Sequence, residues 1–341
     1  MTTPLPVLIT GCSSGIGRAC ALRMHRAGLT VYATARRPET LADLAAEGIR
    51  TLRLDVTDEA SMRAAVDLVE AEHGSVGALV NSAGYAMSGV VEEAGLDDMR
   101  RQFETNVFGL ARLSQLVLPA MRAARRGTIV NISSIFGRYA VPGGGFYQAS
   151  KHAVEALSDA LRLEVADFGV RVVLIEPGPV RTTDFGATYV ANLKPVSKDY
   201  DDFRRRTAEY FDAIYTGSRR TLAGTFAIQS DDVARVVERA VRSARPSARY
   251  PVGFLARSTL ALRRLAPDVV FDNLFVRRAF PVPRNEACGQ TPAIGVHPTA
   301  EAGPATETGP AAGTHGATPI DDAPRSTPPL YSQPRHEGDR R

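Results

Sequence analysis

Short apolar runs alternate with longer amphipathic segments over the first 175 residues, and this alternation constrains the fold more than any other feature. An apolar run bounded by turn residues predicts a buried strand, and a run with a period near 3.6 residues predicts a helix. Repeated units of this kind build a parallel sheet with helices on both faces, so we expect an α/β fold. Strands are predicted at 7–10, 30–35, 51–54, 78–80, 128–132 and 170–175, and helices to about 27 and at 38–46, 58–72, 96–124, 146–168 and 231–243.

A glycine-rich turn follows the first predicted strand. The segment Thr10-Gly11-Cys12-Ser13-Ser14-Gly15-Ile16-Gly17 comes directly after Val7-Leu8-Ile9 and opens the first helix. Glycines let the backbone approach a pyrophosphate closely, and the free N–H groups at a helix N-terminus favour negative charge. A tight turn without a ligand is the alternative. The strand before the turn and the helix after it favour a dinucleotide site in a Rossmann-type, doubly wound parallel sheet.

The end of the second predicted strand indicates which dinucleotide binds. A carboxylate there suits the ribose of NAD, whereas an arginine suits the 2′-phosphate of NADP. The sequence is Thr34-Ala35-Arg36-Arg37, and Arg36 lies 19 positions after Gly17. A guanidinium carries a permanent charge and a fork of donors that fits a phosphate. We therefore predict NADP (NADPH) as the cofactor, with two solvated loop arginines as the alternative.

Tyr147 and Lys151 are the candidate acid–base pair. Their spacing of four residues places both on one face of the predicted helix at 146–168. A nearby ammonium favours the phenolate, so we expect Lys151 to lower the pKa of Tyr147 toward neutral pH and make it a usable general acid/base. Ser134 lies 13 residues upstream of the tyrosine. Together with the glycine-rich turn, these three side chains indicate a nucleotide-dependent oxidoreductase.

Six motifs occur in a fixed order along the chain. They are the glycine-rich turn at 10–17, Asn81-Ser82-Ala83-Gly84, Asn106, Asn131-Ile132-Ser133-Ser134, Tyr147-x-x-x-Lys151 and Pro177-Gly178. As a set they resemble the short-chain dehydrogenase/reductase family, in its branch with a core of about 250 residues. The resemblance covers roughly residues 5–280. Residues 12–14, 31–36 and 176–182 are further similar to the hydroxysteroid and retinol dehydrogenase subgroup, although this second match is weaker.

The resemblance implies a catalytic role at four positions. Tyr147 would exchange a proton with the substrate oxygen, and Lys151 would lower its pKa and bind the nicotinamide ribose. Ser134 would hydrogen-bond the carbonyl, and Asn106 would hold a water in a proton relay. Because successive strand side chains face opposite sides, only one of Ser133 and Ser134 can face the tyrosine, and the 13-residue spacing selects Ser134.

The resemblance also implies where the cofactor lies. Asp55 and Val56 would contact the adenine, and Thr182 would reach the carboxamide. Ser82 departs from the family pattern, which often has a second asparagine there. The residues expected to bind the cofactor are Gly11, Ser13, Ser14, Gly15, Ile16, Gly17, Arg36, Asp55, Val56, Asn81, Ala83, Gly84, Tyr147, Lys151, Pro177, Gly178, Val180 and Thr182.

Composition weighs against several other classes of protein. The net charge of +4 gives no support to nucleic-acid binding. Cys12, Cys20 and Cys288 lack the spacing of metal ligands and suit a reduced, cytoplasmic setting, so no metal is expected. The N-terminus lacks the pattern of a signal peptide, and no run reaches about 18 apolar residues, so no transmembrane helix is expected.

Beyond the last predicted βα unit the chain changes character. In the expected substrate loop at 179–229, seven aromatic residues lie between Phe185 and Tyr215. A lid over an apolar substrate and a helical insertion packed by its aromatics are equally weighted. Residues 254–280 suit amphipathic helices, for which packing against the core is favoured over contact with a membrane or partner. The Pro, Ala, Gly and Thr of 285–341 predict a disordered tail after a single domain at 1–284.

We therefore expect an NADP-dependent oxidoreductase that transfers a hydride between nicotinamide and a carbonyl/alcohol pair of a bulky apolar substrate, such as a steroid, retinoid or lipid. A 3-oxoacyl thioester (acyl-carrier-protein) reductase is one alternative, although it usually needs an exposed basic docking surface. A non-catalytic nucleotide-binding sensor and a protein that acts through its tail are others. The presence of both Tyr147 and Lys151 disfavours the sensor. The helices at 96–124 and 146–168 would form a dimer face, so a homodimer or homotetramer is expected.

Overall fold

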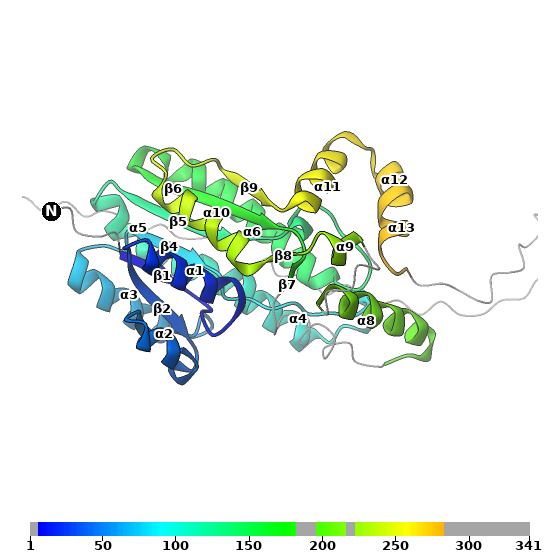
Figure 1. The fold of residues 1–341 in the computed structure, drawn as a ribbon, viewed down its shortest axis with the longest axis horizontal. Helices are drawn as coiled ribbons and strands as arrows, with labels where there is room; N and C mark the ends of the chain where they lie inside the picture. Colours follow the sequence, from blue (N-terminus) through cyan, green and yellow to red (C-terminus); the bar gives the residue numbers. More distant parts are fainter. Residues whose placement is uncertain (1–5, 182–195, 216–221, 283–341) are drawn as a thin grey trace, which may run out of the picture. The chain divides into compact units, whose positions relative to one another are not determined.

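A seven-stranded parallel sheet forms the centre of the molecule (Figure 1). The computed structural model describes residues 6–181, 196–215 and 222–282. The strand order is β3-β2-β1-β4-β5-β6-β9, and every neighbouring pair is parallel. The chain order reverses between β1 and β4, which creates a crevice at the carboxyl ends of these strands. The strands are β1 (Pro6–Ile9), β2 (Thr30–Ala35), β3 (Arg50–Arg53), β4 (Ala78–Asn81), β5 (Gly127–Ile132), β6 (Val170–Pro177) and β9 (Arg249–Val252).

Helices cover both faces of the sheet, as the alternation predicts. Alternate residues of β1 show why: Val7 and Ile9 join the core under α1, α2 and α10 (Ser230–Arg242), while Leu8 joins the core under α3 and α5. The expected α/β, doubly wound fold is confirmed. The helices up to β6 are α1 (Gly15–Arg26), α2 (Ala42–Ala46), α3 (Glu59–His73), α4 (Leu96–Phe103), α5 (Leu110–Ala123) and α6 (Gly145–Glu164), and the 3₁₀ turns are η1 (Pro38–Leu41), η2 (Val91–Glu93), η4 (Ile135–Gly137) and η5 (Ala166–Phe168).

The long helix predicted at 96–124 contains a π-helical segment. This segment, η3 (Glu104–Gly109), joins α4 to α5, and Asn106 lies within it. Gly109 is needed here because a Cβ would lie 2.3 Å from the carbonyl oxygen of Val56. The apolar periodicity that predicts the helix cannot register such a local change of backbone pitch. Widened turns of this kind are often found at functional sites.

Part of the segment expected to be irregular after Pro179 is helical. The described residues contain η6 (Lys198–Tyr200), α8 (Asp201–Tyr215) and α9 (Leu222–Thr225), so the described part of the expected substrate loop is largely helical. A buried ion pair fixes α8, since Arg204 lies 2.7 Å from Glu93 of η2 and both side chains are about nine-tenths buried. Phe185, Tyr189 and Thr182 lie outside the described residues.

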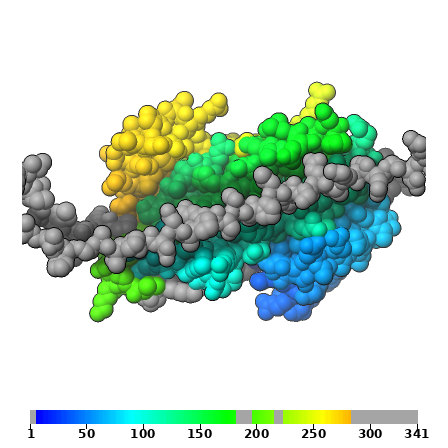
Figure 2. Space-filling model, turned by 180° about the vertical axis from the view of Figure 1, so that it is seen from behind, coloured from blue at the N-terminus to red at the C-terminus, as the bar shows by residue number. Residues whose placement is uncertain are grey.

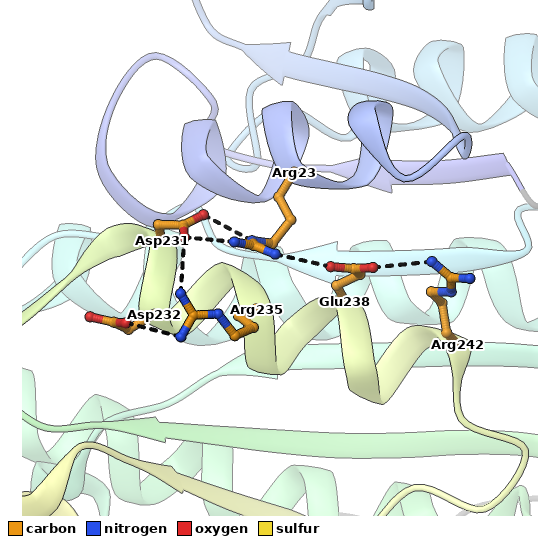
Figure 3. A network of polar contacts seen from close by, with 6 residues as sticks. All are labelled: Arg23, Asp231, Asp232, Arg235, Glu238 and Arg242. Carbon is orange, nitrogen blue, oxygen red and sulfur yellow. Dashed lines mark hydrogen bonds and ion pairs between the residues drawn. The ribbon is translucent and has the colours of Figure 1, made fainter.

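A short second sheet links the end of the first to α10. Strands β7 (Val180–Arg181) and β8 (Ile228–Gln229) pair in parallel, and α10 (Ser230–Arg242) follows directly. Arg23 of α1 holds this helix in place: its guanidinium makes two bonds of 2.7 and 2.8 Å to Asp231 and one of 3.3 Å to Glu238 (Figure 3). The helix that follows the glycine-rich turn is therefore tied to the segment that returns to the sheet.

The last described helices project from one end of the sheet (Figures 1 and 2). They are α11 (Phe254–Leu265), α12 (Asp268–Phe271), the π-helical η7 (Asp272–Val276) and α13 (Arg277–Ala279). Phe271 and Val276 are buried against Tyr139, so the expected packing against the core is present. Within the described ranges, no helix has both the length and the hydropathy needed to cross a bilayer. The tail predicted at 285–341 lies outside them.

Candidate active site

A cavity of about 390 Å³ opens at the carboxyl ends of the parallel strands. Its lining brings together segments that lie up to 269 positions apart, from Gly11 to Phe280. Most of the predicted site residues line it: Gly11, Ser13, Ser14, Gly15, Ile16, Gly17, Arg36, Asp55, Val56, Ala83, Gly84, Ser134, Tyr147, Lys151, Pro177, Gly178 and Val180.

The glycine-rich turn forms one end of the cavity. Gly11 and Gly15 both have positive φ angles, 71° and 57°, which L side chains rarely adopt. A Cβ on Gly17 would lie 2.4 Å from the carbonyl oxygen of Gly11, so the turn closes tightly on the start of α1. The first turn of α1 carries no acidic side chain, and Ser14 at its N-cap makes no side-chain capping bond. The N-terminus of α1 is therefore suited to an anion.

Thr10 connects this turn to the next strand of the crevice. Its hydroxyl accepts hydrogen bonds from the backbone N–H groups of Ser82 and Ala83, each at 3.0 Å. The loop after β4 is thereby held against the loop after β1. Ser82, Ala83 and Gly84 line the cavity along this edge.

The end of the cavity at which adenosine is expected contains Arg36 and Asp55. Arg36 lies exposed just beyond β2, lines the cavity, and has no ion-pair partner among the described residues. Asp55 follows β3, and its carboxylate accepts bonds from the backbone and hydroxyl of Thr57 at 3.0 and 2.8 Å. The carboxylate is thus engaged locally, and the guanidinium of Arg36 remains open to solvent.

Ser134, Tyr147 and Lys151 meet in the middle of the cavity. The Ser134 hydroxyl hydrogen-bonds the phenol of Tyr147 and also accepts the backbone N–H of Phe136 at 3.1 Å. The Lys151 ammonium donates to the carbonyl oxygen of Ile132 at 2.8 Å and lies 5.8 Å from the centre of the Tyr147 ring. Ser133 has its hydroxyl directed instead toward Gly137. The serine chosen by the 13-residue spacing is the one that contacts the tyrosine.

The expected effect of Lys151 on Tyr147 is wrong for the structure as it stands. Burial raises the pKa of Tyr147 to about 12, and the hydrogen bond with Ser134 opposes this rise. Burial also lowers the pKa of Lys151 to about 8, while the nearby charge of Glu155 opposes that fall. Both groups are about nine-tenths buried, and the loss of water is the largest influence on each pKa. The four-residue spacing predicts that Lys151 is a neighbour of Tyr147, but it cannot predict how far burial removes water from both groups.

Two predicted residues, Asn81 and Asn106, are buried and do not line the cavity. The Asn81 amide donates to Ser114 and Asn131 at 3.2 and 2.9 Å, so it ties β4 to β5 and α5. The Asn106 amide clamps the backbone of Tyr85 through both its oxygen and its nitrogen, at 3.1 and 3.0 Å. In the observed arrangement Asn81 braces the sheet against α5, and Asn106 fixes the loop after β4.

An apolar wall forms the other end of the cavity. Tyr210 and Phe211 of α8 belong to the aromatic set of the expected substrate loop, whereas the residues from α11 and the end of the described chain were not predicted to line a site. Phe136 and Tyr139 follow the Ser134 motif directly, and their apolar character is the only local signal. Leu255 and Phe280 carry no such signal, because only the tertiary fold brings them there. The wall consists of Phe136, Tyr139, Val141, Tyr210, Phe211, Ile214, Ala223, Leu255 and Phe280.

A doubly wound parallel sheet, a glycine-rich turn at a helix N-terminus and a serine–tyrosine–lysine group in one cavity define a dinucleotide-dependent oxidoreductase. The family model of the short chain dehydrogenases matches residues 6–193. The chain belongs to this family.

Relatives and solved structures agree with this assignment. An uncharacterized oxidoreductase of Escherichia coli strain K12 is 35% identical over 79% of this chain and 93% of its own. Retinol dehydrogenase 8 of Bos taurus is 33% identical over 80% of this chain and 88% of its own length. A 3-ketodihydrosphingosine reductase of Bacteroides thetaiotaomicron is 41% identical over 58% of this chain and 72% of its own length.

Among solved structures, a short-chain dehydrogenase of Streptomyces avermitilis superposes with a TM-score of 0.65 at 34% identity, covering 80% of this chain and 95% of that one. A serine dehydrogenase complexed with NADP⁺ superposes with a TM-score of 0.62 at 29% sequence identity, covering 73% of this chain and 95% of that one.

Proposed function

We propose that this protein transfers a hydride between NADP(H) and a carbonyl/alcohol pair on a bulky apolar molecule. The observation that carries the proposal is the composition of one cavity. Its two ends differ in chemistry: a glycine-rich turn with Arg36 at one end and an aromatic wall at the other, with Tyr147 between them. A polar, phosphate-bearing molecule and an apolar one would therefore meet at the tyrosine.

The residues at the polar end fit a dinucleotide. The N-terminus of α1 would hold the pyrophosphate, because its N–H groups lack a side-chain cap and its first turn lacks acidic residues. The exposed guanidinium of Arg36 would bind the 2′-phosphate of NADP. The bound nicotinamide supplies or accepts the hydride, while the protein supplies orientation and electrostatic stabilisation.

The three central side chains handle the proton. Tyr147 is protonated at neutral pH because burial raises its pKa, so it is ready to donate to a carbonyl oxygen as that oxygen gains negative charge. Ser134 would donate a second hydrogen bond to the same oxygen. The positive charge of Lys151, present below about pH 8, would stabilise the phenolate that remains. This protonation state suits carbonyl reduction better than alcohol oxidation at neutral pH.

The size and polarity of the apolar wall support a steroid-, retinoid- or lipid-like substrate. The names of two relatives, a retinol dehydrogenase and a 3-ketodihydrosphingosine reductase, denote apolar substrates of this kind. The test is NADPH oxidation measured with all-trans-retinal, a ketosteroid, a long-chain aldehyde, 3-ketodihydrosphingosine and an acetoacetyl thioester, with the Tyr147→Phe protein as the blank. Turnover of the thioester alone would instead favour an acyl-thioester reductase. Dinucleotide binding without any turnover would favour a sensor.

We also propose that the protein is a homodimer or homotetramer and that residues 1–284 suffice for activity. Exposed apolar side chains on η3 and α6 support the first proposal, since Phe108, Leu157 and Leu163 are 55%, 43% and 69% exposed. Light scattering of the wild type and of Leu163→Glu tests it, with a shift to monomer expected for the variant. Turnover and thermal stability of the 1–284 protein, expected to equal those of the full chain, test the second.

A further inference from the structure

Two buried carboxyl groups, one on α6 and one on β6, take no part in the proposed chemistry. Glu155 of α6 and Glu176 of β6 are 5% and 2% exposed. They lie close enough that the charge of Glu155, added to burial, raises the pKa of Glu176 to about 7. A pair of buried carboxyl groups is costly unless cations compensate it, so its surroundings need an explanation.

Two arginines bridge this pair. Arg249 of β9 donates from Nε to Glu155 at 3.0 Å and lies 3.5 Å from Glu176. Arg138 lies 3.6 Å from Glu155 and 3.7 Å from Glu176, as an ion pair with both. We call Arg138, Glu155, Glu176 and Arg249 the carboxylate cluster. Its two carboxylates and two guanidiniums compensate each other's charge.

Three of the four members of the carboxylate cluster lie close in sequence to residues of the proposed site. Glu155 lies one helical turn after Lys151 on α6. Arg138 comes four residues after Ser134, directly beyond η4. Glu176 immediately precedes Pro177 and Gly178, which line the cavity. The cluster therefore joins the three separate segments that must be in register for the reaction.

The contact between η4 and α6 is unusually close. A Cβ on Gly137 would lie 2.9 Å from Cγ of Glu155, 3.1 Å from the carbonyl oxygen of Lys151 and 2.8 Å from the hydroxyl of Ser133. Only glycine allows this approach, and it brings the backbone beside Arg138 directly onto the helix that carries Lys151. The close contact and the ion pairs thus act on the same two elements.

We propose that the carboxylate cluster is a positioning device for the reaction: it locks the Ser134 segment, the Tyr147–Lys151 helix and the Pro177–Gly178 strand end together, and it places the negative charge of Glu155 behind the Lys151 ammonium. Its members are positioning residues and do not touch the cavity. Their contribution to turnover rests on the proposed function, whereas their effect on Lys151 does not.

The chain allows a direct measurement on Lys151, because its lysines number three: Lys151, Lys194 and Lys198. With ¹³C-labelled lysine, each ε-carbon titration is followed by NMR, and Lys151→Arg identifies the signal of Lys151. Glu155→Gln should lower the titration midpoint of Lys151 by at least about half a pH unit, since a favourable charge is removed. Arg138→Gln should leave the midpoint unchanged or raise it, because Arg138 offsets the charge of Glu155.

Asp159→Asn is the matched control. Asp159 also binds Arg249, at 2.5 Å, and lies one turn farther along α6, but its side chain is 38% exposed. Its substitution should leave the Lys151 midpoint within about 0.2 pH units of wild type. A midpoint in Glu155→Gln that moves no more than in Asp159→Asn would overturn the charge placement.

Turnover provides the second arm. Glu155→Gln and Arg138→Gln should each lower kcat by about tenfold or more with little change in the Kd for NADPH, and Glu155→Asp should restore part of the loss. If Glu155→Gln does not fold, the half-exposed Arg138 and the conservative Glu155→Asp still decide the matter. Normal kcat in both Arg138→Gln and Glu155→Asp would overturn the positioning role. A wild type without turnover would refute the proposed function, and the lysine titrations would still test the cluster.

Discussion

The Lys151 ammonium donates to the carbonyl oxygen of Ile132 at 2.8 Å, and this bond ties α6 to the strand that leads to Ser134. It is one of several contacts that hold α6 against β5; another joins the amide of Asn131 to the hydroxyl of Ser158 at 2.8 Å. The lysine is therefore oriented before any ligand arrives. Preorganised donors lose little energy to reorganisation when charge develops nearby.

Replacing Tyr147 with phenylalanine should abolish most turnover and spare cofactor binding. The ring packs against Ala86 and near Phe136 and Phe211, and these contacts survive the loss of the hydroxyl. Without the proton donor, kcat should fall by at least about 10²-fold. Lys151→Ala should weaken both kcat and NADPH binding. The measurements are steady-state kinetics and a fluorescence titration with NADPH; near-normal turnover of Tyr147→Phe would mean that another group supplies the proton.

Carbonyl reduction should decline above about pH 8. The pKa of Lys151 is lowered to about 8, so its positive charge is present below that pH and is lost above it, while Tyr147 stays protonated to higher pH. Since kcat/KM reports the groups of the free enzyme, its logarithm for NADPH-dependent reduction should bend downward near pH 8. Lys151→Arg, which stays charged, should lose this bend. A bend that persists in the arginine variant would have to come from another group.

Arg36→Ala should erode the preference for NADPH over NADH by about tenfold or more. A charge-assisted bond to a phosphate contributes about 1.5–3 kcal/mol, and NADH lacks that phosphate. Arg37, its exposed neighbour that does not line the cavity, offers a control: Arg37→Ala should change the ratio of kcat/KM values much less. Equal kcat/KM values for the two cofactors in the wild type would contradict the role of Arg36.

Large apolar carbonyls should be reduced with a kcat/KM at least about 10²-fold above that of acetone-sized ones, a difference of about 2.7 kcal/mol. The apolar wall is expected to supply this free-energy difference, because each methylene of the substrate that it buries contributes about 0.8 kcal/mol. Phe211→Ala should narrow the gap by weakening the large substrate. Phe226→Ala serves as the control, since Phe226 stacks on Phe254 at 4.9 Å outside the cavity lining. A flat dependence on substrate size would leave the aromatic residues with a packing role only.

Glu176→Gln should gain stability relative to the wild type as the pH rises from about 5 to 8. The pKa of Glu176 is raised from 4.5 to about 7 in the folded protein. Between these values the folded state binds more protons than the unfolded state, so the free energy of unfolding falls as the pH increases. Glutamine does not titrate and escapes this loss. The difference in Tm between the two proteins, followed by thermal denaturation across this range, should drift in favour of the variant; a constant difference contradicts the shift.

The sequence predicts the first six strands and most helices well because β1, β2, β4, β5 and β6 are mostly buried runs bounded by clear turns, whereas β3 is partly exposed. The proposed catalytic trio could also be predicted from the sequence, since Tyr147 and Lys151 share one helix and Ser134 follows a strand. The direction in which a side chain points is harder to predict from the sequence. The motif positions of Asn81 and Asn106 indicate the cavity, yet hydrogen bonds to Asn131 and Tyr85 turn both amides into the walls.

Tertiary effects account for the remaining differences. The polar and charged surface of α8 obscures its helical period, and its position depends on the ion pair of Arg204 with Glu93, 111 positions away. The pKa values of Tyr147 and Lys151 depend on burial by segments that local spacing does not describe. The carboxylate cluster likewise combines residues from four separate segments of the chain. No local pattern in the sequence predicts that these residues contact one another.

The apolar wall draws many of its members from residues 210–280, whereas the cofactor end and the proton-transfer group come from the first 180 residues. Under the proposed function, the chemistry and most of the substrate contacts are thus encoded in consecutive stretches of the gene. Substitutions confined to the wall residues of the later stretch would leave in place the contacts of Asp231 and Arg249 with the earlier one. A chimera that joins residues 1–196 of this chain to the corresponding end of a relative should inherit the relative's substrate range and keep this protein's cofactor.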